Sequence, residues 1–337
     1  ECLSSVQVCV SFFALSTICL SGVTQWVAHI LQHPEKKTGV CVLLQGSQGC
    51  GKGTIFDPIR EIVGHDATFQ CSGPKAKDQL FGKFSVGLKN TVFVQIDEAK
   101  DMFELDELVK DVVVIDRKQF EDKGVQPYKL KVFANIVVTS NADHPIAIPD
   151  TERRWVAVRC KETHTGDTTY FTDLHTFLKK PETLRGIYQA LMRHDIADRG
   201  NMQHERPITQ YYLECRNISM CPLARFLSAL CNSSSDDTVV KTIQSSALYK
   251  DFLTFAAGLG GDAVKKWNVT LFGLRMKEYA DTENSGISMP GRSGKSGGVV
   301  VYIFQHDVLL EHLKSRRRYD EHAELHQLDF APPCQGS

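Results

Sequence analysis

The sequence lacks an excess of charge of either sign, and it lacks cysteine pairs with metal-binding spacing. Its 39 Lys and Arg face 40 Asp and Glu in 337 residues, a net charge of −1. Such a total does not reveal a nucleic-acid partner, because a basic face can lie within a balanced chain. Eleven Cys include no Cys-x-x-Cys pair, and a chain of this length needs no disulfide scaffold. We therefore expect reduced cysteines and an intracellular rather than a secreted protein, with nucleus and cytoplasm both open.

The sequence also lacks Asp, Glu, Lys and Arg between Cys2 and Pro34. A membrane or signal segment is one interpretation of such a stretch, but no positive region precedes it and several serines interrupt it. We expect instead that residues 1–35 form a buried N-terminal helical segment and that no membrane is involved. Because the chain begins with Glu1 rather than Met, a truncated or mistranslated start is the alternative explanation.

Short apolar runs separated by helical stretches begin after residue 36. The runs at 40–44, 91–96 and 134–139 are continuous and rich in β-branched residues, which is typical of strands that are covered on both faces. Strands that alternate with helical segments predict an open α/β sheet. We therefore expect residues 36–162 to form a core with a parallel sheet and helices on both of its faces.

The strand signals fade after this core. Residues 171–198 have helical periodicity, and the polar segment 232–237 predicts a linker or long loop. Beyond it, two helical patterns precede a Gly/Ser-rich loop at 286–298 and a clear strand at 299–304. This order resembles a winged helix. The predicted regions are a helical region and linker (163–240), a winged-helix-like domain (241–318) and a tail (319–337).

A glycine-rich loop follows the first predicted strand and precedes a predicted helix at 55–63. Glycines let backbone N–H groups turn toward phosphate oxygens, and the helix N-terminus adds its positive end, so this context predicts a phosphate site. Lys52 is expected to contact the β- and γ-phosphates of ATP. Gly53 replaces the usual Ser or Thr, which makes Thr54 the candidate ligand of Mg²⁺. The predicted loop comprises Gly46, Ser47, Gln48, Gly49, Cys50, Gly51, Lys52, Gly53 and Thr54.

Polar residues end the other two predicted strands. We expect Asp97 to hold Mg²⁺ and its water shell, Glu98 to polarise the attacking water, and Asn141 to contact the γ-phosphate. Arg153 and Arg154 follow further along the chain. An arginine that reaches the nucleotide of a neighbouring subunit raises hydrolysis by about 10³–10⁵-fold. Either member of the pair is a candidate for this role.

The order and spacing of these segments resemble superfamily 3 helicases, the AAA+-type motors of small DNA genomes. The likeness is greatest to the helicase region of phage, plasmid and poxvirus-like primase–helicases, strong over about 25–160 and weaker beyond. It implies an AAA+-like P-loop sheet, ATP hydrolysis with Mg²⁺, and a homo-hexameric ring that moves along single-stranded DNA at a fork. The resemblance rests on the segments 26–37, 46–54, 80–84, 94–99, 120–124 and 139–141, with Arg153 and Arg154.

The resemblance also implies a hairpin between the acidic pair and Asn141 that enters the ring and grips DNA. Here it maps to Lys123, with Lys118 and Lys129 nearby. Lysines that contact phosphates give the sequence-independent grip that a translocating motor needs. The basic candidates for DNA binding in the winged-helix-like domain are Lys277, Arg292 and Lys295.

Two other functions stay open at this point. A decayed viral-type remnant would bind DNA without ATPase activity, which Gly53 and the unusual N-terminus suggest. A P-loop kinase would need an acceptor base and an Arg-rich lid, and would not need a basic winged helix. The chain shows no primase or polymerase signature, so we expect such a domain or partner upstream of Glu1. The family suggests movement from 3′ to 5′, which the residues alone do not establish.

Overall fold

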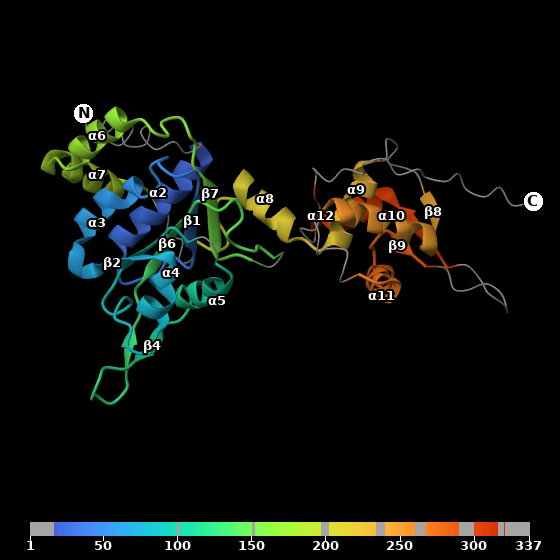
Figure 1. The fold of residues 1–337 in the computed structure, drawn as a ribbon, viewed down its shortest axis with the longest axis horizontal. Coiled ribbons are helices and arrows are strands. Elements are labelled where there is room, and N and C mark those ends of the chain that lie inside the picture. The colour runs from blue at the N-terminus through green and yellow to red at the C-terminus, as the bar shows by residue number, and fades with distance from the viewer. Residues whose placement is uncertain are drawn as a thin grey trace, which may run out of the picture. The chain divides into compact units, whose positions relative to one another are not determined.

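The structure is a computed structural model that describes residues 17–99, 102–149, 152–196, 202–233, 240–259, 267–289, 300–315 and 320. The chain forms two compact units, residues 1–215 and 216–337 (Figure 1). The division falls inside the region that was predicted as a helical region and linker (163–240). Each unit is described by itself.

The first unit is an α/β fold around a five-stranded sheet. Its strand order is β2-β3-β6-β1-β7, and all neighbours are parallel. The prediction of a parallel α/β sheet is therefore confirmed, and three of the five strands match predicted runs within two residues. The edge strands β2 and β7 were not predicted. β2 is mostly polar and has one buried residue, whereas β7 has four buried apolar residues that come directly after the arginine pair. The strands are β1 (Cys41–Gln45), β2 (Thr68–Ser72), β3 (Phe93–Asp97), β6 (Asn135–Ser140) and β7 (Trp155–Arg159).

Helices cover both faces of this sheet (Figure 1). Val42 and Leu44 of β1 belong to one core cluster, whereas Cys41 and Leu43 belong to the other, as the alternation of side chains along a strand requires. The helices of the first face are α2 (Thr17–Gln32), α3 (Asp57–Val63), α6 (Thr168–Leu178) and α7 (Pro181–Arg193). Those of the second face are α4 (Gly73–Ala76), α5 (Phe103–Val112) and α8 (Gln210–Ser219). Single-turn helices lie at η1 (Thr54–Phe56), η2 (His65–Ala67) and η3 (Lys77–Phe81).

The described part of the uncharged N-terminal stretch is helix α2, which belongs to the core. Trp26 is fully buried, and its ring meets those of Phe56 and Phe93 at centroid distances of 6.3 and 6.0 Å. Its Nε1 donates a hydrogen bond to Thr38 Oγ1 at 3.0 Å. Within the described ranges no helix is both long and apolar enough to cross a membrane. Residues 1–16 of the predicted N-terminal segment lie outside the described residues.

A two-stranded antiparallel hairpin extends from this unit (Figure 1). It consists of β4 (Arg117–Phe120) and β5 (Tyr128–Lys131), with Lys118 opposite Leu130 and Gln119 opposite Lys129. Gly124 in its loop has φ +78°, a conformation that glycine adopts at little cost. A hairpin therefore lies where the family resemblance placed one.

The second unit combines helices with a small antiparallel sheet of order β8-β10-β9. Asn268 caps the N-terminus of α11, since its side chain accepts a hydrogen bond from Leu271 N at 2.8 Å. Asp320 is buried against α9, where it pairs with Arg225 Nε at 3.2 Å. The elements are α9 (Pro222–Asn232), β8 (Val240–Gln244), α10 (Ser245–Gly258), α11 (Val269–Ala280), β9 (Ile287–Ser288), β10 (Val301–Gln305) and α12 (His306–Ser315).

Candidate functional site

Three neighbouring strands bring the predicted site residues to one edge of the sheet. β3, β6 and β1 are adjacent and parallel, so their carboxyl ends meet at the same edge. The 46–54 loop follows β1. Asp97 is the last residue of β3 and Glu98 follows it, and Asn141 follows β6. In open α/β sheets, ligands bind in the crevice beyond the carboxyl ends of the strands. The fold therefore places these segments together, although they are far apart in sequence.

The 46–54 loop is tightly turned. Gly49 and Gly51 have φ of +82° and +90°, which disfavours any other residue there. At Gly46 a Cβ atom would lie 2.9 Å from Cys50 Sγ and 3.2 Å from Cys160 Cβ, so a side chain would clash. Lys52 is buried, and its Nζ donates to the carbonyl oxygens of Gly46 and Ser47 at 2.7 Å each. The loop thus wraps around a positive charge at the edge of the sheet.

The backbone conformation and the surroundings of Gly53 do not require a glycine after the lysine. Gly53 has helical angles, φ −70° and ψ −39°, and a Cβ there would meet only Gln95 Nε2, at 3.9 Å. A Ser or Thr would fit this position. Thr54 begins η1 and is partly exposed. Its role as a metal ligand stays a prediction.

The carboxylate of Asp97 is fixed by neighbouring side chains. Its Oδ1 accepts hydrogen bonds from Gln95 Nε2 at 2.8 Å and from Thr139 Oγ1 at 3.0 Å, and Gln70 binds its other oxygen. Thr139 Oγ1 also accepts from the backbone N–H of Glu98 at 3.3 Å. β3 and β6 are therefore joined through polar groups at the edge where the predicted nucleotide site lies.

Glu98 and Asn141 are exposed at the same edge. Glu98 has φ +54°, which is uncommon for a residue other than glycine. Such conformations cluster at functional sites, because the surrounding structure must hold them in place. The catalytic roles predicted for Asp97, Glu98 and Asn141 stay predictions, and the structure places all three at one edge with the 46–54 loop.

Arg153 and Arg154 lie at the amino ends of the parallel strands, opposite the carboxyl ends where the 46–54 loop lies. They precede β7, whose first residue pairs with Cys41 at the start of β1, whereas Arg159 pairs with Gln45 beside the loop. Four strand steps of about 3.3 Å separate the two ends of β1, a distance that exceeds an arginine side chain. The structure therefore does not bring the arginine pair to the 46–54 loop of the same chain.

Arg159 occupies the place beside the loop, and sequence reasoning missed it. Its Nε donates to Gln45 Oε1 at 3.0 Å, its Nη1 pairs with Glu214 at 2.7 Å, and its guanidinium lies 4.6 Å from the centre of the Tyr211 ring. Only the strand pairing identifies this residue, because β7 was not among the predicted strands.

The segment after β7 lies against the 46–54 loop. Cys160 N donates to Gln45 O at 2.7 Å, and a Cβ at Gly51 would meet the Phe171 ring at 2.8 Å. The pKa of the Cys50 thiol is lowered to about 6, chiefly because the Cys160 thiol donates a hydrogen bond to it, and also because Lys52 is nearby. Burial of Cys50 opposes this shift. The loop therefore contains a thiol that ionises near neutral pH.

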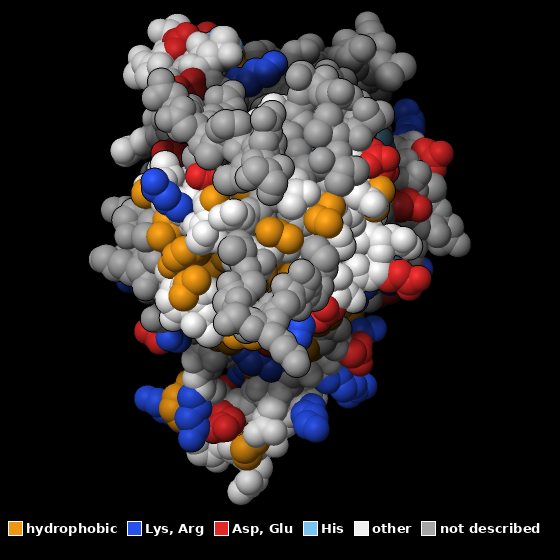
Figure 2. Space-filling model, turned by 90° about the vertical axis from the view of Figure 1, so that its right-hand side faces the viewer, with side chains coloured by type: hydrophobic (Ala, Val, Ile, Leu, Met, Phe, Trp, Pro, Cys, Tyr) orange, Lys and Arg blue, Asp and Glu red, His pale blue; other side chains and the backbone are white. Residues whose placement is uncertain are grey.

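The hairpin has one cationic face and one packing face. Lys129 and Lys131 are exposed on β5, and they lie opposite Gln119 and Arg117 of β4, which are exposed as well. Residues two apart on a strand point to the same face, so Arg117, Lys129 and Lys131 form one surface. Lys123 is exposed in the loop. Lys and Arg side chains gather with a few acidic ones at the lower end of Figure 2, where Figure 1 places the hairpin.

Lys118 lies on the other face of the hairpin. Its Nζ donates to Leu80 O at 3.1 Å and sits 5.4 Å from the centre of the Phe81 ring, and burial lowers its pKa. This lysine fixes the hairpin to η3, whereas Arg117 and Lys131, which were not predicted, are on the exposed face. Only the pairing of β4 with β5 separates the two faces, because strands of four residues are too short for an alternating pattern to stand out.

The basic candidates of the second unit are only partly described. Lys277 is exposed on α11, next to an ion pair between Arg275 and Glu278 at 2.9 Å. Arg292 and Lys295 lie outside the described residues. The DNA-binding roles of all three stay predictions.

Comparison with known proteins finds one family model and one curated phage protein that are similar to part of this chain. Residues 44–154 match a family model described as a family of unknown function, DUF5906. Over 139 residues the chain is 27% identical to the DNA primase-polymerase of Nitratiruptor phage NrS-1, which is 40% of this chain and 19% of that protein. The chain thus spans about a fifth of the length of this curated relative.

Solved structures of the C-terminal region of the NrS-1 protein share the fold. One has a TM-score of 0.64 at 15% identity, over 89% of this chain and 75% of that chain. Another has a TM-score of 0.59 at 14% identity, over 89% and 74% respectively. At such low identity the likeness shows the fold alone.

Proposed function

We propose that this chain is the ATP-driven motor of a viral-type DNA replication protein and belongs functionally with superfamily 3 helicases. The observation that carries the proposal is the convergence of the 46–54 loop, Asp97, Glu98 and Asn141 at the carboxyl edge of adjacent parallel strands. These residue types in this order are those that bind a nucleoside triphosphate and activate water. The shared fold with the NrS-1 C-terminal region, and the relation to a phage replication protein, support the same conclusion.

The geometry suits ATP hydrolysis. Backbone N–H groups of the 46–54 loop and the Lys52 ammonium would bind the phosphates. Thr54 and Asp97 would hold Mg²⁺, which neutralises charge on the phosphates and takes its other ligands from phosphate and water. Glu98 would accept a proton from the attacking water, and Asn141 would orient that water toward the γ-phosphate.

A ring is part of the proposal because the arginine pair lies away from the loop of its own chain. Arg153 or Arg154 can approach a nucleotide only on a neighbouring copy. A homo-hexamer, with each nucleotide between two subunits, satisfies this requirement. An arginine supplied in trans couples hydrolysis to assembly and is worth about 10³–10⁵-fold in rate.

Single-stranded DNA at a fork is the proposed substrate of the motor. The exposed cationic face of the hairpin can neutralise backbone phosphates, and Phe84, which is 50% exposed, can stack on a base. The Phe84 loop lies beside the hairpin, since Lys83 pairs with Glu121 at 3.2 Å. In the second unit, the element order α9, β8, α10, α11, β9, β10 resembles that of a winged helix. This resemblance supports the proposal that Lys277 on α11 binds duplex DNA.

A primase or polymerase activity is proposed to reside elsewhere, in a domain or partner that acts with this motor. The NrS-1 protein is named a primase-polymerase, and this chain corresponds to a fifth of it. In this proposal Lys52 binds the phosphates of ATP, and Arg153 and Arg154 are the candidates that act in trans. They fit a motor that supplies single-stranded template.

Steady-state ATP hydrolysis, with and without single-stranded DNA, tests the proposal. We expect hydrolysis that DNA stimulates, and we expect Lys52→Ala to lose it because the phosphates lose their charge partner. Lys179→Ala, which changes an exposed lysine directly after α6, is the matched control. Turnover that survives in Lys52→Ala would remove the site assignment, and DNA binding without any hydrolysis would favour the decayed remnant.

A further inference from the structure

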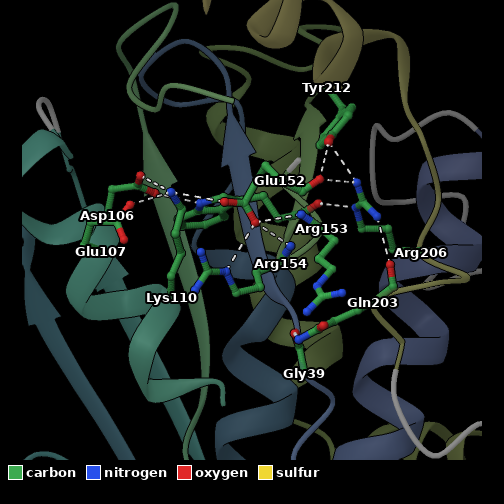
Figure 3. A network of polar contacts seen from close by, with 11 residues as sticks. Gly39, Asp106, Glu107, Lys110, Glu152, Arg153, Arg154, Gln203, Arg206 and Tyr212 are labelled. Carbon is green, nitrogen blue, oxygen red and sulfur yellow. Dashed lines mark hydrogen bonds and ion pairs between the residues drawn. The ribbon is translucent and has the colours of Figure 1, made fainter. Parts of the chain in front are cut away.

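The turn before β7 holds the two arginines in different ways. Arg154 is partly buried, and its Nε lies 3.5 Å from Glu152 Oε1. Arg153 is exposed, and Figure 3 shows its guanidinium directed away from Glu152. The backbone of Arg154 is also fixed to the sheet, since its carbonyl oxygen accepts from Cys41 N at 2.7 Å. Arg153 is therefore the member of the pair that can reach outward.

Glu152 organises this turn from a buried position. Its side chain is 3% exposed, and its Oε1 accepts hydrogen bonds from the backbone N–H groups of Arg153 at 2.8 Å and Arg154 at 2.6 Å. Its Oε2 pairs with Lys110 Nζ at 3.1 Å. One carboxylate thus ties two consecutive backbone amides to helix α5 (Figure 3).

Lys110 is itself held in place by further partners on α5. Its Nζ pairs with Asp106 and, at 3.0 Å, with Glu107, and Asp106 Oδ1 accepts from Trp155 Nε1 at 2.8 Å. Burial disfavours the charge of Lys110, but the hydrogen bonds that its ammonium donates to Asp106 and Glu107 outweigh burial and raise its pKa. Burial likewise opposes ionisation of Glu152, but its bonds to Arg154 and Lys110 lower its pKa. Both groups are charged at neutral pH.

The carbonyl group of Glu152 is fixed from the other side. Arg206, which is 7% exposed, donates from Nη2 to Glu152 O at 2.7 Å and from Nε to Trp155 O at 3.1 Å. Tyr212 Oη donates to Glu152 O at 2.9 Å. The residue before the arginine pair is therefore held through its side chain and its backbone (Figure 3).

Stability alone does not account for this cluster. Buried ion pairs cost much desolvation, and apolar side chains of similar volume often stabilise a fold equally well or better. What charged groups provide is a defined geometry, and a catalytic side chain needs supporting groups that fix it within a fraction of an ångström. The cluster fixes the residues that flank Arg153 and leaves its guanidinium outside.

We infer that Glu152, held by Lys110, is a positioning residue that aims Arg153 at the nucleotide of a neighbouring subunit. The inference rests on the proposed function and names Arg153 rather than Arg154 as the arginine that acts in trans. Arg154 then serves, with Glu152, as part of the support. Among the described residues, Glu152 and the arginine pair precede β7 at the end of the sheet away from the 46–54 loop, so we expect their effect on hydrolysis to pass between subunits.

The test measures ATP hydrolysis by Glu152→Ala and Glu152→Gln, alone and mixed with Lys52→Ala. Glu152→Gln keeps the volume and one acceptor oxygen, so it serves as the conservative variant. We expect kcat to fall at least tenfold in Glu152→Ala and less in Glu152→Gln. Nucleotide affinity should stay unchanged in both variants, because the substitution leaves the 46–54 loop of the variant subunit intact. In mixtures, Lys52→Ala subunits supply an intact Arg153 to the loop of the Glu152 variant, so hydrolysis should exceed the sum of the separate proteins.

The Arg153→Ala variant mixed with Lys52→Ala is the control, and it should recover in the same way. Recovery with Arg153→Ala but not with either Glu152 variant would overturn the inference and leave the proposed function intact, as would wild-type kcat in both Glu152 variants. Hydrolysis by Lys52→Ala alone, or none by the wild-type chain, would overturn the proposed function and the inference together. A merely structural defect would lower nucleotide affinity and would not be repaired by mixing.

Discussion

At the scale of single residues, sequence order located residues that the fold brings to one edge of the sheet, while their roles in a site stay predictions. Asp97 and Asn141 could be located because each lies at or just after the end of a continuous apolar run, and Lys52 because it lies in the glycine-rich loop that follows such a run. Parallel strands bring such positions together. This reasoning does not predict which of Lys118 and Lys131 is exposed. Both lie in one basic segment, and only the pairing of β4 with β5 decides which of them is exposed. Arg159 was missed for the same reason, since its strand was not foreseen.

The ionisation of Cys50 gives a residue-scale prediction. Because its pKa is lowered to about 6, the thiolate should predominate at pH 7, and alkylation by iodoacetamide should rise with a midpoint near pH 6. Thiolates are the reactive form of cysteine. Mass spectrometry of the labelled peptides measures this rate, and Cys71, whose pKa burial raises to about 12, is the internal control.

Two variants separate the causes of this shift. Cys160→Ala removes the hydrogen-bond donor that contributes most, and Lys52→Ala removes the nearby positive charge, so both should move the midpoint upward. Bound ATP should protect Cys50, because the thiol lies inside the loop. A midpoint that stays in the ordinary range of thiols, near 8.5, would contradict the contacts described for the loop.

At the scale of elements, the hairpin is the part that the family resemblance predicted and periodicity alone did not. Its strands are only four residues long, too short for an alternating pattern to stand out among turn residues. The central strands β1 and β6 are buried along their whole length, so they can be recognised in the sequence as apolar runs. Edge strand β2 has one buried residue and therefore gives no such signal. Prediction from sequence thus succeeds at the centre of the sheet and weakens toward its edges.

The two faces of the hairpin give a prediction about DNA binding. Lys129→Ala/Lys131→Ala should weaken binding of single-stranded DNA uniformly across sequences, because both lysines lie on the exposed cationic face. Each lost phosphate contact should lower the slope of log affinity against log salt by about 0.7, so the pair should lower it by about 1.4. Fluorescence anisotropy across a salt series measures this slope.

Lys179→Ala/Lys180→Ala is the matched control, since both lysines are exposed away from the hairpin. It should leave the slope unchanged. Lys118→Ala should instead loosen the hairpin from η3, where its ammonium is bonded to Leu80 O, and lower thermal stability. Equal salt slopes for the hairpin pair and the control pair would show that DNA binds elsewhere.

At the scale of the whole molecule, the chain joins an α/β unit with a parallel sheet to a smaller helical unit with an antiparallel sheet. The sequence indicated both parts, but it placed boundaries by composition, whereas the division at residues 215 and 216 falls inside helix α8. A helix that runs through a boundary carries no linker composition, so no sequence pattern marks it. The proposed motor needs both units, one to hydrolyse ATP and one to hold duplex DNA ahead of the fork.

Strand displacement on a forked DNA substrate tests the central claim most directly. We predict that the wild-type chain separates the strands when ATP is present, that a non-hydrolysable analogue does not support the reaction, and that Lys52→Ala is inactive while it still binds DNA. Labelled forks with one tail at a time would also report the direction of movement. If the chain hydrolyses ATP and binds the fork but separates no strands, the account of a DNA motor is wrong.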